Sequence, residues 1–233
     1  MRFRVSLFEK YPGVHIGVLV GRGLRNPPVD TRVEEAKREA VNALKAKVGD
    51  GPVSRHPYIA SWREMYRSFK TKAADYNPSV EALVRRALKE GVLPRINVAV
   101  DAYNAVSVRH LVPMGGFDLD KVRGDIQLRL SEGGETFTPL GPAAPEETYQ
   151  GEVVYADDER ILTRRWNYRD CEETKIAVGT VNVVMFVDGS PGIPRSVVEE
   201  ALRDLEDLLR ASCDGEYKRS ALGGRDSELD LSL

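Results

Sequence analysis

The spacing of the apolar residues changes near the middle of this chain, and that change constrains the fold more than any other feature. Between residues 31 and 108 apolar side chains recur at intervals of three and four, as at Val33, Ala36 and Ala40. This spacing predicts amphipathic helices. In the second half they alternate with polar residues, as over residues 126–130, and alternation predicts strands. The sequence therefore predicts an α+β fold, with helices of the first half packed on mostly antiparallel strands of the second half.

The boundaries of these elements follow from turn and cap signals. Helices are expected at residues 31–48, 59–69, 77–90, 95–108 and 194–211. Strands are expected at residues 3–7 and 14–20, joined as a short hairpin, and at 126–130, with 137–140 returning as its partner strand. Further strands are expected at 153–155, 161–166, 174–178 and 181–187. We interpret residues 1–211 as a single domain and the polar residues 212–233 as a flexible tail.

Composition excludes several classes of protein. The net charge of -2 excludes a strongly basic nucleic-acid binder, although a local basic patch remains compatible with it. Two cysteines, Cys171 and Cys213, do not make a disulfide framework. No signal peptide and no apolar run of membrane-spanning length is found, so we expect a protein of the reducing cytoplasm without a membrane partner.

Familiar catalytic motifs are missing. The chain has no phosphate-binding P-loop and no dinucleotide glycine fingerprint. Its three histidines, His15, His56 and His110, have no second His or Cys at metal-ligand spacing. We therefore expect no metal and no cofactor.

The segment from Arg164 to Asp170 carries the densest chemistry of the sequence. It holds three arginines, which suit phosphate, together with Trp166 and Tyr168, whose flat rings can stack on a base. Asp170 could orient a water molecule or a ribose hydroxyl. This combination suits the end of an RNA that carries a small acyl group. A strand ending in a salt-bridged, aromatic-capped loop would have a similar sequence.

A polar stripe interrupts the apolar residues of the helix expected at 95–108. Asn97, Asp101, Asn104 and Ser107 recur at steps of four, three and three, and Tyr103 lies beside them. Polar groups in apolar surroundings are costly unless they are hydrogen-bonded or face a site.

Two further groups are candidates for binding. Gly115 and Gly116 precede Asp118 and would allow a backbone to approach a ligand closely, although a tight turn explains them equally well. Thr180 and Asn182 lie on a later strand and could add hydroxyl and amide groups, or serve the strand itself.

An ordered set of short motifs resembles the B3/B4 domain, which occurs in the β subunit of bacterial phenylalanyl-tRNA synthetase and as freestanding proteins. The motifs are LPxINxxVDxYNxxS at residues 93–107, PMGGFD at 113–118, GDIxLR at 124–129 and GExFxPLG at 134–141. The resemblance covers about residues 55–190. The WRxxY motif at 62–66 and the RRWN motif at 164–167 look more like the freestanding group, and residues 1–50 lie outside the motifs.

The resemblance implies an editing pocket that hydrolyses a wrongly attached amino acid from tRNA. Asp170 falls near the glutamate of the synthetase's editing site and would hold the attacking water or the ammonium of the amino acid. The amides of Gly115 and Gly116 would stabilise the oxyanion, although the synthetase has a histidine where this chain has Gly115. Asn104 and Asn167 would orient the substrate.

The remaining candidates would bind the RNA or the amino acid. Arg164, Arg165 and Trp166 would hold the terminal phosphates and adenine. The other expected binding residues are Arg63, Tyr66, Asp101, Tyr103, Asp118, Thr180 and Asn182.

Three functions are compatible with these residues. The first is a trans-editing deacylase whose partner is the aminoacylated 3′ end of tRNA, with an aminoacyl-tRNA synthetase as a further candidate partner and no DNA partner. The second is a non-catalytic RNA-binding or small-ligand module, which the missing histidine favours. The third is a protein-interaction domain with a salt-bridged arginine surface.

Overall fold

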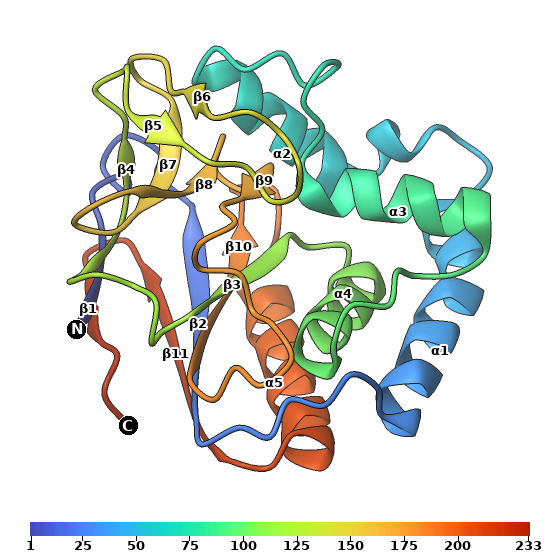
Figure 1. The fold of residues 1–233 in the computed structure, drawn as a ribbon. Coiled ribbons are helices and arrows are strands. Elements are labelled where there is room, and N and C mark those ends of the chain that lie inside the picture. The colour runs from blue at the N-terminus through green and yellow to red at the C-terminus, as the bar shows by residue number, and fades with distance from the viewer.

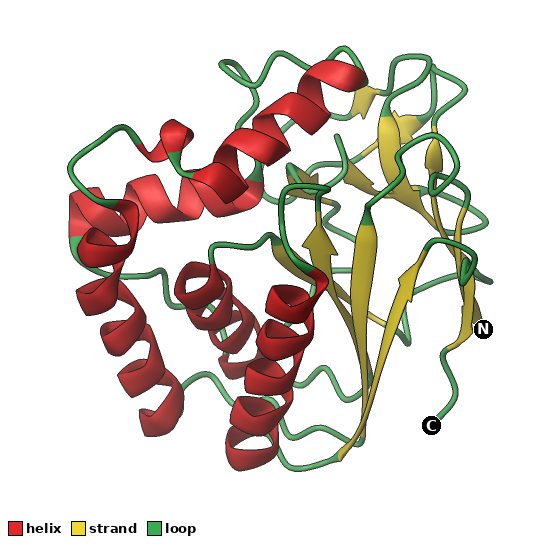
Figure 2. Cartoon of the chain, turned by 180° about the vertical axis from the view of Figure 1, so that it is seen from behind, coloured by secondary structure: helices red, strands yellow, loops and turns green.

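The computed structural model describes residues 1–233 and places most helices on one side of the molecule and the strands on the other (Figures 1 and 2). The helices are α1 (Thr31–Val48), α2 (Pro57–Ser68), α3 (Ser79–Glu90), α4 (Val98–His110) and α5 (Arg195–Ser212), with a short 3-10 turn at Val53–Arg55. The strands are β1 (Arg2–Val5), β2 (His15–Arg22), β3 (Met114–Asp118), β4 (Ile126–Leu130), β5 (Thr136–Phe137), β6 (Glu146–Glu147), β7 (Val153–Ala156), β8 (Ile161–Arg164), β9 (Arg169–Asp170), β10 (Val183–Gly189), β11 (Glu216–Gly223) and β12 (Glu228–Asp230). The predicted α+β class is confirmed.

Two sheets form the β half of the fold. The six-stranded sheet has the order β12-β1-β4-β7-β8-β9, and the four-stranded sheet has the order β11-β2-β10-β3. Strands β5 and β6 make a separate pair. All neighbours in the two sheets are antiparallel except β1 and β4, which run parallel.

The two sheets meet through a cluster of aromatic rings. Phe3 and Tyr155 come from the six-stranded sheet, and their ring centroids lie 4.7 and 4.9 Å from that of Phe186 in the four-stranded sheet. Phe117 on β3 packs against the same ring at 5.8 Å. Such tilted pairs add to the free energy gained by burying the rings. The far face of the four-stranded sheet is covered by helices α4 and α5 (Figure 2).

The expected helices are confirmed, but three strand predictions are wrong. Strands β1 and β2 form no hairpin, because β1 pairs with β4 and β12 while β2 pairs with β10 and β11. Strand β5 pairs with β6 and not with β4. Residues 174–178 form a loop, since the carbonyls of Ile176 and Ala177 accept hydrogen bonds from the side chains of Asn97 and Asn26.

The expectation of a flexible tail at residues 212–233 is also wrong. Strand β11 pairs with the whole length of β2, and β12 pairs with β1. Tyr217, Leu222 and Leu231 are buried, whereas charged residues such as Glu216 and Lys218 face solvent. Charged residues dominate the composition of this segment, and the two buried residues of β11 are five positions apart, so the sequence shows no simple alternation of a strand.

None of the helices combines the length and the apolar character that a membrane span requires.

Replacing Leu222 by Ala should destabilise the protein by about 2 to 5 kcal/mol, because the substitution leaves a cavity beneath β11. Glu216→Ala on the same strand is the matched control and should change the free energy of unfolding by less than about 0.5 kcal/mol. Urea unfolding of both variants measures the difference. Equal, small effects would mean that β11 contributes little to the folded state.

Candidate functional site

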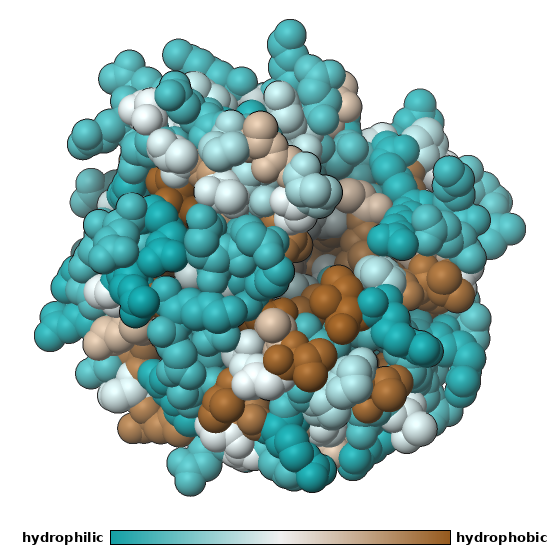
Figure 3. Space-filling view, in the orientation of Figure 1, coloured by the Kyte–Doolittle hydropathy of each residue, from teal (hydrophilic) through white to brown (hydrophobic).

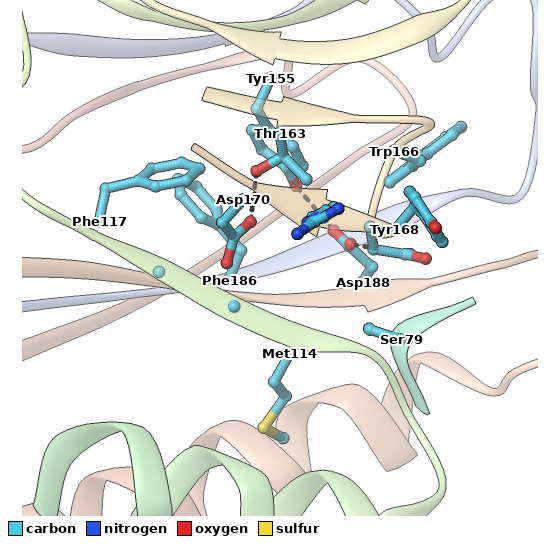
Figure 4. A pocket seen from close by; sticks show the side chains of 14 residues that line it. Ser79, Met114, Phe117, Tyr155, Thr163, Trp166, Tyr168, Asp170, Phe186 and Asp188 are labelled. Atoms are coloured by element: carbon cyan, nitrogen blue, oxygen red, sulfur yellow. Dashed lines mark hydrogen bonds between the residues drawn. The ribbon is translucent and has the colours of Figure 1, made fainter. Parts of the chain in front are cut away.

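A small cavity of about 60 Å³ lies between the two sheets, beside the first residue of α3 (Figure 4). Figure 3, which has the orientation of Figure 1, shows a hollow near the middle of the molecular surface, with apolar side chains in and beside it. The cavity is lined by Ser79, Met114, Gly115, Gly116, Phe117, Tyr155, Thr163, Trp166, Asn167, Tyr168, Arg169, Asp170, Phe186 and Asp188. It has room for a few water molecules, and polar groups from both sheets can reach them.

The four-stranded sheet supplies one wall of this cavity. Gly115 on β3 pairs with Phe186 on β10, so both residues lie on the same face of the sheet. Asp188 is two residues beyond Phe186 and shares that face. A Cβ atom added to Gly115 would lie 3.7 Å from Oδ2 of Asp170, so the missing side chain leaves open space in front of that carboxylate.

Asp170 projects from β9 of the six-stranded sheet into this space. Its Oδ1 accepts a hydrogen bond of 2.6 Å from the hydroxyl of Thr163 on β8, as Figure 4 shows. Its Oδ2 has no hydrogen-bond partner in the protein. Burial disfavours the charged form and raises the pKa of Asp170 to about 6, although the Thr163 hydrogen bond acts in the opposite direction. One oxygen of the carboxylate is thus held in place and the other is free.

Asp188 is a second carboxylate of the cavity, and a chain of hydrogen bonds fixes it. The hydroxyl of Tyr155 donates to its Oδ1 at 2.7 Å, and Nδ2 of Asn167 donates to its Oδ2 at 3.1 Å. The hydroxyl of Tyr66 donates in turn to Oδ1 of Asn167 at 2.9 Å. Burial raises the pKa of Asp188 to about 6, and the negative charge of Asp170 adds to this rise. Both oxygens of Asp188 therefore serve the network.

Arg164 and Trp166 of the RRWN motif are buried and make their contacts inside the protein. Nε and Nη2 of Arg164 donate to the two oxygens of Glu152 at 2.8 and 2.7 Å, and its Nη1 donates to Glu146 at 2.6 Å. Trp166 is fully buried, and its ring packs against those of Trp62 and Tyr11. The structure contradicts the expectation that Arg164 and Trp166 bind phosphate and adenine, because Glu152 and Glu146 occupy the guanidinium and the indole is fully buried.

Arg165 differs from Arg164 in having no acidic partner. Its guanidinium lies 3.7 Å from the ring centroid of Tyr76 and 5.4 Å from that of Tyr168. Arg165 and Trp166 both have left-handed backbone conformations, with φ of 49° and 67°. Arg165 is outside the cavity lining, but its neighbours Trp166 and Tyr168 belong to it.

The polar stripe of α4 is structural and lies outside the cavity. Asn97 caps α4 by accepting from the amide of Val100, and Asp101 pairs with Lys37 at 2.9 Å. Asn104 is half-buried and does not line the cavity, so the expected catalytic role of Asn104 and the binding role of Asp101 find no support there. The stripe instead joins α4 to α1 and to loops on either side.

Tyr103 on the same helix is half-buried and packs on the main core. Burial raises its pKa, and the negative charge of Asp170 contributes to the rise. Tyr103 therefore lies within electrostatic range of the site without lining the cavity.

The other expected binding residues hold loops together. Thr180 donates to Asp118 at 2.8 Å, and Asn182 donates to Asp120 at 2.9 Å, so both fasten the loop before β10 to the end of β3. Arg63 donates to the buried Glu81 at 2.9 Å and thereby joins α2 to α3. Tyr66 stands behind Asn167 and reaches the cavity only through it. None of Arg63, Asp118, Thr180 and Asn182 lines the cavity.

The two glycines of β3 have different roles. The amide of Asp188 donates to the carbonyl of Pro113, and the amide of Leu119 donates to the carbonyl of Asn182. In an antiparallel pair every second residue of a strand bonds to its neighbour, so on β3 residues 113, 115, 117 and 119 bond to β10. The amide of Gly115 therefore bonds to β10, whereas the amide of Gly116 points to the outer edge of the sheet. A Cβ on Gly116 would lie 2.6 Å from the carbonyl oxygen of Val184, so this position has no room for a side chain.

Sequence reasoning missed Asp188, Tyr155, Thr163 and Ser79. Asp188 follows an apolar strand directly, and a carboxylate at that point was the one available signal. Tyr155 and Thr163 are ordinary strand residues by composition. Thr163 meets Asp170 because β8 and β9 pair within one sheet, whereas Tyr155 meets Asp188 through the packing of the two sheets. No set of three or more His, Cys, Asp and Glu side chains is placed to hold a metal ion.

The variant Asp170→Asn should be more stable than the wild type at neutral pH and equally stable at pH 4. Because the pKa of Asp170 is raised from about 4 to about 6 on folding, the wild type loses stability as the pH rises through this window. Partial exposure limits the gain of the variant to about 1 to 2 kcal/mol at pH 7.5. Urea unfolding between pH 4 and 8 measures it, and a pH-independent difference would contradict the raised pKa.

Comparison with known proteins places this chain in a family. The chain is 35% identical over 100 residues to the phenylalanine–tRNA ligase beta subunit of Fusobacterium nucleatum subsp. nucleatum, a match that covers 43% of this chain and 12% of that subunit. An N-terminal fragment of the phenylalanyl-tRNA synthetase beta subunit from Pyrococcus horikoshii aligns with a TM-score of 0.46 and 17% identity. That alignment covers 92% of this chain and 50% of the fragment, so the chain spans only part of either relative.

The model of the B3/4 domain family matches residues 61–213, which is well over half of the chain. The match contains most of α2, all of α3, α4 and α5, and both walls of the cavity. The resemblance carried by the short sequence motifs is thereby confirmed, and this chain belongs to the B3/4 domain family.

Proposed function

We propose that this protein hydrolyses the ester bond of a mischarged aminoacyl-tRNA that another enzyme has made. The observation that carries the proposal is the free Oδ2 of Asp170, which faces open space at Gly115. A carboxylate with a pKa of about 6 is ionised at neutral pH and is still basic enough to take a proton from water. The similarity to a phenylalanine–tRNA ligase beta subunit supports an aminoacylated tRNA as the substrate.

The reaction needs little machinery, because an ester of a ribose hydroxyl is more reactive than an amide. Asp170 accepts a proton from a water molecule as its oxygen attacks the ester carbonyl. The carbonyl oxygen becomes an oxyanion, for which the free amide of Gly116 is the available donor on β3. When the tetrahedral intermediate collapses, the bond to the ribose oxygen breaks and Asp170 returns the proton to that oxygen. The products are a free amino acid and an uncharged tRNA.

A panel of tRNAs, each charged with a correct or an incorrect amino acid, tests the proposal directly. Hydrolysis confined to one or a few mischarged species would establish editing in trans and identify the amino acid. Absence of hydrolysis across the whole panel would contradict a deacylase function. Measurable binding of uncharged tRNA in that case would favour the second candidate below.

Asp170→Asn should lower the rate of deacylation about 100-fold or more, because a positioned general base contributes at least this factor. In the wild type, kcat/KM should fall about tenfold per pH unit below a midpoint near pH 6 and should level off above it, since only the ionised carboxylate accepts a proton. Pre-steady-state deacylation across pH 5 to 8 measures both. An unchanged rate in the variant would remove Asp170 from the mechanism.

The two glycines provide a matched pair of substitutions. Gly115→Ala places a methyl group at ordinary contact distance from Asp170, so the variant should fold normally and lose turnover by filling the space for water. Gly116→Ala forces a carbon against the carbonyl of Val184 and should destabilise the protein by about 1 to 3 kcal/mol. Thermal unfolding and deacylation of both variants separate the two effects. A fully active Gly115→Ala variant would show that the water occupies another position.

A non-catalytic binding module is the second candidate. The observation that favours it is the absence of histidine from the cavity lining, at the position where the synthetase domain has one. The two carboxylates would then recognise a cationic group, such as the ammonium of an amino acid, without hydrolysis.

A further inference from the structure

We infer that Arg165 is a receptor for the terminal phosphodiester of an RNA acceptor end, placed at the rim of the cavity. This inference rests on the proposed function, because it names the group that would hold the RNA part of the substrate. It can be tested without turnover, so its failure and the failure of the proposed function are separable.

The guanidinium of Arg165 is buried and has no hydrogen-bond partner. Arg165 is 6% exposed, and its Nε and Nη1 are inaccessible to solvent and make no hydrogen bond. Its Nη2 also lacks a partner but is not among the inaccessible atoms, so this nitrogen reaches the surface. Arg165 forms no ion pair with any carboxylate, whereas Arg164 pairs with both Glu146 and Glu152. The charge of Arg165 is therefore uncompensated in the protein alone.

An uncompensated buried charge is unfavourable, and the local backbone adds to the cost. Removing an ion from water costs several kcal/mol unless a counter-charge replaces the lost hydration. The stacking on Tyr76 and Tyr168 offsets part of this cost. The left-handed conformations of Arg165 and Trp166 are disfavoured for side chains of this size. Both the unpaired charge and the unfavourable backbone are accounted for if an anionic ligand binds Arg165. A purely structural arginine would be expected to have an acidic partner, as Arg164 does.

The surroundings of Arg165 suit an anion at the rim of the cavity. Tyr168, which lies against the guanidinium, also lines the cavity. Ser79 lines it as well, and its hydroxyl is buried without a partner. Ser79 begins the twelve-residue helix α3, whose N-terminus has no side-chain cap. An uncapped helix N-terminus favours negative charge. The amide of Ser79 is itself occupied, since it donates to the carbonyl of Asn167 at 3.1 Å, so only the following amides of the first turn could contribute.

The loop between α2 and α3 extends this positive character outwards. Tyr76, which stacks on Arg165, belongs to this loop. Lys70 and Lys72 in the same loop are exposed, make no ion pair and line a shallow groove with Arg67. Since the last phosphodiester of an RNA adjoins the ribose that bears the ester, an RNA with its ester at Asp170 would bring that phosphate close to the rim. The planar guanidinium stacks on Tyr76 and can donate to a phosphate through Nη2, the one nitrogen of the group that reaches the surface.

The test is the binding of the uncharged RNA oligonucleotide ACCA to the full protein at several salt concentrations. Arg165→Met retains the packing of the side chain but removes the charge, and should weaken binding about tenfold or more. The slope of log K against log salt should fall by about 0.7, the value for one phosphate contact on single-stranded RNA. Arg203→Met removes an exposed arginine of α5 that makes no ion pair, and should change neither quantity.

Thermal unfolding and two further ligands make the test decisive. The unfolding temperature of Arg165→Met should not fall, because the arginine side chain has no hydrogen bond or ion pair to lose and methionine retains the packing on Tyr76. If this variant does unfold, Arg165→Lys, which keeps the charge and loses the planar fork, should fold and bind ACCA with intermediate affinity. Adenosine should bind wild type and Arg165→Met equally. Unchanged affinity and slope in Arg165→Met would overturn the inference, and inorganic phosphate that binds as tightly as ACCA would show a site for free phosphate instead.

Discussion

The buried ion pair between Arg164 and Glu152 is the interaction on which the site depends. Glu152 receives two nitrogens of Arg164 and the backbone amide of Arg165, so one carboxylate fixes the start of the turn between β8 and β9. Removing either partner would leave a buried charge unpaired, which is strongly destabilising. Because the turn is fixed in this way, its left-handed residues persist and each side chain that follows has a defined direction.

Neighbouring residues of that turn have different roles, some in the core and some in the cavity. Trp166 enters the core, Asn167 joins Tyr66 to Asp188, and Asp170 on the returning strand reaches the cavity. The opposite wall is bare at Gly115, so Asp170 has open space before one oxygen and a hydroxyl on the other. The same short segment thus contributes a structural ion pair, a buried network and a free carboxylate.

Sequence patterns predicted the helices well, since an amphipathic helix such as α5 shows its period directly. They failed where pairing is long-range: β11 pairs with β2 across most of the chain, and β1 joins β4 in a parallel pair. For the site, residue chemistry singled out Asp170 but could not separate Arg164 from Arg165, because only the fold decides which arginine meets Glu152. Asp188 could not be found from local sequence, since its role arises when two separate sheets pack together. Thr163 acquires its role when β8 pairs with β9, and the sequence does not give the register of that pair.

Asp170 is a carboxylate of near-neutral pKa in a cavity built by two sheets, and carbon-13 NMR titration of the side-chain carboxyl groups measures this pKa directly. We expect two carboxyl signals with midpoints near pH 6, of which one is absent in Asp170→Asn. The other should belong to Asp188 and move to lower pH in that variant, because the neighbouring negative charge is gone. A midpoint near 4 for Asp170 would show instead that the carboxylate is an ordinary solvated group without the basicity that the proposed reaction needs.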